Sequence, residues 1–322
     1  MPIIKESSYS KRPSLYFNAW METLVPYFTA KSHKVVYERE RLELHDGDFV
    51  DLDWVRKDSE TLIIISHGFE GNSQDHFIEE SASHFGKKGV DVLVWHYRSC
   101  SKDLNRLPRF YDHGDIRDLH EVITHAAQEG NYSQVILLGF SMGGNFVVNY
   151  LGSEIQSDIV KCGIVFSTPM DLSAASKKLK KGLNHLVEKS FIKKLKRKIE
   201  RKAVVFPELF DLEKLKTMDS LEKLYKEYVL LHHDFSDLDQ YYSKWSSSQF
   251  LPKIKIPLLI VNAQNDPLLS EYCYPYKQCQ KNEYVSLETP RYGGHTGFTK
   301  KKDGKLWYLW RIEGFIAGKA KL

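Results

Sequence analysis

The chain has 322 residues, of which 42% are hydrophobic and 27% are charged, and its formal net charge is +4. This length and composition are typical of a folded protein with one large domain or two small ones, and they exclude a disordered tail. The modest net charge gives no reason to expect a nucleic acid partner, and no run of 18 apolar residues predicts a membrane-spanning helix.

The cysteines and the N-terminal stretch predict a cytoplasmic setting. The cysteines are too few for a disulfide framework in a chain of this length, and their spacing matches no zinc pattern; they are Cys100, Cys162, Cys273 and Cys279. Polar residues and prolines interrupt the N-terminal apolar stretch, so neither a signal peptide nor an anchor is expected there; they are Pro13, Asn18, Glu22 and Pro26.

The first regular pattern lies between residues 34 and 66. Residues 34–44 alternate apolar and charged side chains, which predicts a half-exposed strand. Asp46-Gly47 is a hairpin turn signal, and residues 48–55 alternate again. The run TLIIIS at 61–66 is short, unbroken and β-branched, as expected of a strand buried on both faces.

The buried-strand pattern then recurs along the chain and alternates with stretches of helical length. Further strands are predicted at 90–97, 134–140, 161–167, 257–263 and 283–289. Helices are predicted at 75–88, 115–128 and 142–151, with a closing helix at 306–318. Alternating strands and helices predict a mostly parallel sheet of eight strands, covered by helices on both faces.

One segment interrupts this rhythm. Residues 168–250 contain no buried-strand pattern, which predicts a helical cap inserted into a core made of residues 1–167 and 251–322. Residues 177–202 hold twelve Lys or Arg and two Glu, a net charge of +10, so the rest of the chain carries −6. Such a run usually forms a solvated helix face. The alternative is contact with anionic lipid, since five apolar residues share the segment: Leu179, Leu183, Leu186, Phe191 and Leu195.

The residues Gly139-Phe140-Ser141-Met142-Gly143 have the form G-x-S-x-G between a predicted strand and a predicted helix. A serine on such a sharp turn exposes its hydroxyl at the end of the sheet. A structural turn serine is the alternative reading of a pattern this short. The strand-turn-helix context favours a nucleophile.

A nucleophilic serine needs a histidine as base and a carboxylate that orients the histidine. Asp266 follows one late predicted strand, and His295 follows the next, in the chain order expected for this architecture. Asp171, which follows the strand at 161–167, stays open as an alternative acid. Developing negative charge on a carbonyl oxygen would be held by backbone amides, and the amides of Phe69 and Met142 are the predicted donors.

Several motifs together resemble the α/β-hydrolase superfamily, and within it the YheT-like branch, also called hydrolase family four. Residues 67–73 (HGFEGNS) are similar to the HGLEG-type oxyanion loop of that branch, and residues 105–114 (NRLPRFYDHG) resemble its NRLPRxYxxG segment. GFSMGGN, NAQNDP and GGHTGF complete the match. Residues 20–23 (WMET) fit the branch's HLQT-like stretch more loosely, and residues 98–102 (RSCSK) replace its RGCSG.

The resemblance implies an α/β-hydrolase fold and a serine hydrolase that cleaves carboxylic esters. Lipid esterases and phospholipases occur among its eukaryotic members, so short- to medium-chain acyl esters are the implied substrates. Ser141, His295 and Asp266 would be the catalytic residues, and no metal or organic cofactor is implied. Acyl transfer to an alcohol, or a binding protein with an unused triad, remain the alternatives.

Overall fold

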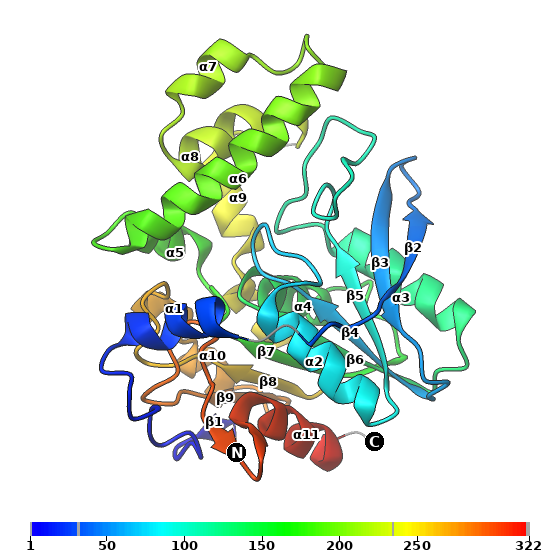
Figure 1. Ribbon diagram of the computed structural model, residues 1–322, viewed down its shortest axis with the longest axis vertical. Coiled ribbons are helices and arrows are strands. Elements are labelled where there is room, and N and C mark those ends of the chain that lie inside the picture. The colour runs from blue at the N-terminus through cyan, green and yellow to red at the C-terminus, as the bar shows by residue number, and fades with distance from the viewer. Residues whose placement is uncertain (1, 31–32, 234, 320–322) are drawn as a thin grey trace.

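The computed structural model describes residues 2–30, 33–233 and 235–319. Its centre is a nine-stranded sheet with the strand order β1-β9-β8-β7-β6-β4-β5-β3-β2 (Figure 1). The strands are β1 (Ile3–Ile4), β2 (Glu38–Glu43), β3 (Phe49–Val55), β4 (Thr61–Ser66), β5 (Asp91–His96), β6 (Gln134–Phe140), β7 (Val160–Phe166), β8 (Leu258–Val261) and β9 (Val285–Glu288). The α/β-hydrolase fold expected from the sequence is confirmed.

The sheet is mostly parallel, and it has one more strand than the sequence predicted. Strands β2 and β3 form an antiparallel hairpin, β3 pairs antiparallel with β5, and all other neighbours are parallel. The additional strand is β1, which pairs with β9 so that Ile3 lies opposite Leu287. Two residues are too short to produce an alternating pattern, so the prediction of eight strands missed this edge.

Strand β4 shows why the sheet is covered on both faces. Leu62 and Ile64 belong to one buried cluster, whereas Ile63 and Ile65 belong to the other. This follows from the two-residue period of a strand, which sends successive side chains to opposite faces. Helices on the first face are α3 (Ile116–Glu129) and α4 (Met142–Leu151); those on the second are α2 (His76–Lys87) and α11 (Trp307–Lys319).

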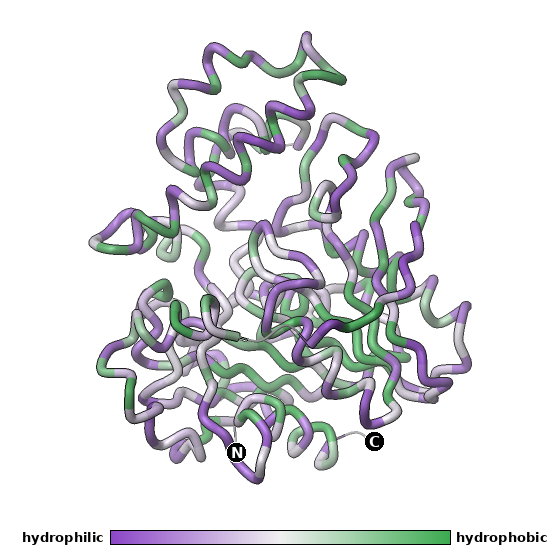
Figure 2. Tube along the Cα trace, in the orientation of Figure 1, coloured by the Kyte–Doolittle hydropathy of each residue, from purple (hydrophilic) through white to green (hydrophobic). Residues whose placement is uncertain are grey.

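Residues 172–253 are helical and contain no strand in their described part. We call them the helical segment; it comprises α5 (Leu172–Leu179), α6 (Asn184–Val205), α7 (Leu212–Thr217), α8 (Leu221–Leu224), a π-helical turn (Tyr225–Val229), α9 (Leu238–Trp245) and the 3-10 turns Leu230–His232, Ser247–Gln249 and Leu251–Lys253. It has its own buried cluster, which includes Leu195, Ile199 and Leu224. Figure 2 shows hydrophilic residues along most of α6 and hydrophobic residues along the central strands of the sheet. The division into core and cap domains stays a prediction.

A helix near the N-terminus was not predicted. Helix α1 (Ala19–Thr29) begins after Asn18, whose side chain accepts a hydrogen bond from the amide of Met21 at 2.9 Å. The remaining elements are α10 (Tyr276–Gln280), the 3-10 turn Glu271–Cys273 and a short hairpin of β10 (Lys301–Lys302) and β11 (Lys305–Leu306). Within the described ranges, no helix combines the length and the apolar character that crossing a bilayer requires. The cytoplasmic location stays a prediction.

Candidate active site

Ser141 lies on the sharp turn between β6 and α4. Its backbone angles are φ 53° and ψ −120°, a sparsely populated conformation that costs on the order of 1–3 kcal/mol in a non-glycine residue. At this turn the start of α4 lies very close to the sheet, and only glycine leaves enough room. A Cβ atom on Gly139 would collide with the backbone of Gly143, and one on Gly143 with the carbonyl of Ser66. The two glycines of the motif are therefore required by close contact.

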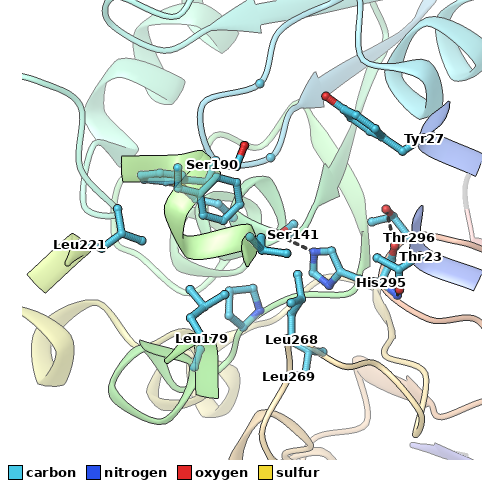
Figure 3. A pocket seen from close by; sticks show the side chains of 18 of the residues that line it. Thr23, Tyr27, Ser141, Leu179, Ser190, Leu221, Leu268, Leu269, His295 and Thr296 are labelled. Atoms are coloured by element: carbon cyan, nitrogen blue, oxygen red, sulfur yellow. Dashed lines mark hydrogen bonds between the residues drawn. The ribbon is translucent and has the colours of Figure 1, made fainter. Parts of the chain in front are cut away.

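His295 lies between Ser141 and Asp266. Its Nε2 is 2.9 Å from Oγ of Ser141 (Figure 3). Its Nδ1 is 2.8 Å from Oδ2 of Asp266. The Asp266 side chain is fully buried, and its Oδ1 accepts hydrogen bonds from the amides of Leu268 and Leu269. A carboxylate at Nδ1 favours the tautomer that carries its proton there, which leaves Nε2 free to accept the serine proton. The structure thus brings the three predicted side chains into one hydrogen-bonded chain.

Asp171, the alternative acid, has a different position. Its side chain accepts a hydrogen bond from the amide of Ala174 at 2.8 Å and caps the N-terminus of α5. The carboxylate at Nδ1 of His295 is instead that of Asp266. The geometry therefore favours Asp266 as the partner of His295.

Helix α1 supports the loops that carry His295 and Asp266. The buried carboxylate of Glu22 accepts hydrogen bonds from the amide of Gly293 at 2.6 Å and from the side chain of Asn265 at 2.9 Å. Oδ1 of Asn265 accepts from the amide of Gly294 at 3.1 Å, and Oγ1 of Thr23 accepts from the amide of His295 at 3.0 Å. This role of α1 was not predicted from the sequence. The only signal was that Glu22 and Thr23 fall within the loosely matched residues 20–23.

The predicted oxyanion donors, the amides of Phe69 and Met142, belong to the two segments that flank Ser141. Met142 is the first residue of α4, so its amide precedes the first intrahelical hydrogen bond. Gly68 packs against the turn, since a Cβ atom there would lie 3.7 Å from Cβ of Ser141.

The peptide that joins Gly68 to Phe69 is held through its carbonyl oxygen. That oxygen accepts hydrogen bonds from the amide of Gly71 at 3.1 Å and from Nδ1 of His67 at 2.8 Å. Burial lowers the pKa of His67 well below its ordinary value, so the imidazole is neutral and carries its proton on Nδ1. His67 thus fixes the orientation of the peptide whose amide belongs to Phe69.

A cavity of about 530 Å³ opens above Ser141 and His295, with mostly apolar walls. Figure 3 shows Leu179 and Leu221 from the helical segment and Leu268 and Leu269 from the loop after β8 around the two polar side chains. Helix α1 contributes a further wall, with Trp20, Leu24, Tyr27 and Phe28. Such a cavity suits an apolar ligand with one polar reacting group.

The predicted apolar and basic side chains of residues 177–202 do not form two simple faces. Leu179, Leu183, Leu186 and Phe191 line the cavity, but Leu195 is buried inside the helical segment, which corrects the expected apolar face. Two of the basic side chains are also buried, those of Lys198 and Lys202. Lys202 donates to the backbone carbonyl groups of Asn105 and Leu107, and burial lowers its pKa to about 7.

The loop at residues 98–102, where two family glycines are replaced, still adopts a left-handed turn. Ser99 has φ 61°, and its hydroxyl group accepts a hydrogen bond from the amide of Asn105 at 3.1 Å. The Arg98 side chain is buried and donates to Asp118 and Asp48.

Within the described part of the chain, no group of three or more His, Cys, Asp or Glu side chains is arranged to hold a metal ion.

Comparison with known proteins agrees with this architecture. A family model described as the alpha/beta hydrolase fold matches residues 61–301. The chain belongs to the alpha/beta hydrolase fold family. YheT of Escherichia coli, a candidate esterase, is 28% identical over 289 residues, which cover 88% of this chain and 85% of that protein. This similarity confirms the predicted membership of the YheT-like branch of the hydrolase family.

Two further proteins extend the comparison. The mouse phospholipase ABHD3 is 25% identical over 308 residues, which cover 92% of this chain and 74% of that protein. The esterase Pf2001 of Pyrococcus furiosus has a similar structure, with a TM-score of 0.61, 16% identity, and coverage of 96% of this chain and 97% of that chain. At this identity the structural match shows the hydrolase fold alone, whereas the named relatives support hydrolase activity.

Proposed function

We propose that the protein is a serine hydrolase that cleaves carboxylic esters through an acyl-enzyme. The observation that carries the proposal is the hydrogen-bonded chain from Ser141 through His295 to Asp266 at the base of an apolar cavity. Serine, histidine and aspartate in this order supply a nucleophile, a base and the group that orients the base.

In the proposed reaction, Oγ of Ser141 attacks the ester carbonyl carbon while Nε2 of His295 takes the serine proton. The amides of Phe69 and Met142 donate hydrogen bonds to the oxygen that becomes negative. His295 then gives its proton to the leaving alcohol, and Asp266 stays ionised beside the imidazolium. Water, activated by His295, attacks the acyl group and releases the carboxylic acid and Ser141.

The cavity supports an apolar acyl group as the part of the substrate that is bound. Its volume of about 530 Å³ and its leucine and aromatic walls suit a short- to medium-chain acyl ester. The mouse relative is named a phospholipase, which makes a lipid-derived ester a reasonable member of this substrate class.

Replacing the proposed nucleophile tests the function. We expect Ser141→Ala to lower kcat for p-nitrophenyl esters by several orders of magnitude, up to about 10⁶-fold, and to abolish labelling by a fluorophosphonate probe. Its melting temperature serves as the control for folding. A folded Ser141→Ala protein that hydrolyses these esters at the native rate contradicts the proposal. Product analysis with added alcohol separates hydrolysis from acyl transfer.

We also propose that the helical segment contacts anionic lipid beside the cavity. The cavity walls include exposed Tyr27 and Phe28 on α1 and exposed Leu183 and Leu186 near the start of α6. The same helix exposes basic side chains further along: Lys189, Lys193 and Arg197. Apolar side chains flanked by positive charge favour an anionic bilayer surface, from which an ester could reach the cavity.

Vesicle sedimentation tests this contact. Each cation near an anionic surface contributes about 1 kcal/mol, so the triple variant Lys189→Gln/Lys193→Gln/Arg197→Gln is expected to bind phosphatidylglycerol vesicles roughly 100-fold more weakly. The matched control removes the same charge from exposed lysines outside α6, as Lys253→Gln/Lys255→Gln/Lys277→Gln. Equal binding by both variants, or no binding by the native protein, contradicts the lipid contact.

A further inference from the structure

Helix α6 contacts the loop after β4 along one side of its surface. Phe191, Lys194 and Lys198 are three and four residues apart, which brings their side chains to the same face of the helix. The ring of Phe191 meets the ring of Phe69 edge to face, with centroids 4.9 Å apart. Nζ of Lys194 donates to the carbonyl oxygen of Glu70 at 3.3 Å, and Nζ of Lys198 lies 2.7 Å from Oε1 of Glu70.

The contact between Lys198 and Glu70 is a buried ion pair. Only 8% of the Lys198 side chain and 5% of the Glu70 side chain are exposed. Nζ of Lys198 also lies 3.4 Å from Sγ of Cys100 and 5.0 Å from the ring centroid of Tyr111. Burial lowers the pKa of Lys198, but the interactions with Cys100 and Glu70 together outweigh burial. The pKa is therefore raised above its ordinary value, and the ammonium group stays charged.

Glu70 needs such support because its backbone has an unfavourable conformation. Its φ angle of 52° lies in the left-handed region, which non-glycine residues rarely adopt. The amide of Glu70 donates to Oη of Tyr111 at 3.1 Å, and that hydroxyl group donates to Oε1 of Glu70 at 2.9 Å. Lys198 and Tyr111 therefore share one carboxylate oxygen, and together they fix the peptide that follows Phe69.

We propose that Lys198 is a positioning residue, which acts through Glu70 to aim the amide of Phe69 at the developing oxyanion. The peptide before Phe69 is held by His67 and Gly71, and the peptide after it by Lys198 and Tyr111. The position of α6 then affects the rate of the chemical step as well as the shape of the cavity. This inference rests on the proposed function, since it assigns a role within the same site.

The kinetic signature separates positioning from a purely structural role. An oxyanion donor acts mainly in the transition state, so its displacement lowers kcat and leaves KM nearly unchanged. Complete loss of one donor lowers kcat by about 100- to 1,000-fold in a comparable hydrolase. Because Met142 stays in place and Phe69 is only displaced, we expect Lys198→Met to lower kcat about 10- to 100-fold.

The test measures kcat and KM for a short p-nitrophenyl ester, together with the inhibition constant of a boronic acid that forms a tetrahedral adduct. In Lys198→Met the inhibition constant should rise by the same factor by which kcat/KM falls. Lys216→Met, which replaces an exposed lysine on α7 of the same helical segment, is the matched control and should change neither quantity. Lys198→Arg keeps the charge and should recover most of the rate.

A second variant covers the case in which Lys198→Met fails to fold because Glu70 is left without its partner. Lys198→Met/Glu70→Gln removes both charges and should fold, and its kcat should still be reduced. Native kcat in either variant, with a melting temperature showing that it is folded, overturns the inference. Ser141→Ala tests the nucleophile separately. If Ser141→Ala loses its activity while Lys198→Met keeps the native kcat, the positioning role of Lys198 is rejected and the proposed function is not.

Discussion

The end of the sheet and the helical segment contribute to the site in different ways. Each of the residues Ser141, Asp266 and His295 follows a strand end, on a short loop fixed by glycines or by backbone hydrogen bonds. The helical segment contributes side chains from helix faces, such as Leu179 and Leu221, that share no short motif. The proposed chemistry is therefore set by local geometry, whereas the cavity is set by how separate helices pack.

The largest expected difference between the two regions concerns their two candidate acids. Asp266 contacts His295, whereas Asp171 caps α5 at the start of the helical segment. Asn at position 266 would place its amide group at Nδ1 of His295 and favour the wrong tautomer, a change that lowers kcat about 10⁴-fold in a serine protease. We expect Asp266→Asn to lower kcat for a p-nitrophenyl ester by about 10³- to 10⁴-fold.

Asp171→Ala is the matched control for this substitution. Loss of an N-cap costs about 1 kcal/mol of stability, so its melting temperature should fall by a few degrees while kcat stays within about twofold of the native value. Steady-state kinetics and thermal unfolding of both variants check the comparison. A loss of rate at Asp171 that equals the loss at Asp266 would reverse the assignment of the acid.

Residues at strand ends were predictable because a buried-strand pattern ends there and a turn or helix pattern begins. The runs at 61–66 and 134–140 are short and unbroken, which suits strands buried on both faces, and the G-x-S-x-G pattern lies at the end of the second run. Order along the chain then pointed to His295 and to an acid before it, either Asp266 or Asp171, without knowledge of their distances. Eight of the nine sheet strands carry enough residues to show a pattern, and the two-residue strand β1 does not.

Contacts between distant segments were not predictable from the same information. Lys198 belongs to a run of basic residues that reads as a solvated face, and only the packing of α6 on the loop after β4 shows that it is buried. Helix α1 contains Pro26, and its aromatic side chains follow no clear period, so no pattern predicted its position beside His295. In both cases the ion or hydrogen-bond partner lies far away in the chain.

Glu22 lies on α1, which belongs to neither the strand-end loops nor the helical segment. Its replacement is expected to have the smallest effect on kcat, and it tests whether a third region supports the site. Both carboxylate oxygens of Glu22 accept hydrogen bonds, one from Asn265 and one from Gly293. A glutamine at this position has a single acceptor oxygen, so its NH₂ group would face one of these two donors. We expect Glu22→Gln to lower kcat about 10-fold, since the loop that carries His295 would shift while the cavity stays intact.

The measurement compares kcat and KM of Glu22→Gln with those of Glu6→Gln, an exposed glutamate in the same N-terminal region. KM should stay within about twofold of the native value, because Glu22 does not line the cavity. The cost of one unmet buried donor, on the order of 1–3 kcal/mol, should instead displace the loop of His295 and lower kcat. An unchanged kcat would mean that Asp266 and Thr23 alone hold His295. The support that α1 gives to the loop of His295 would then come from Thr23 and not from Glu22.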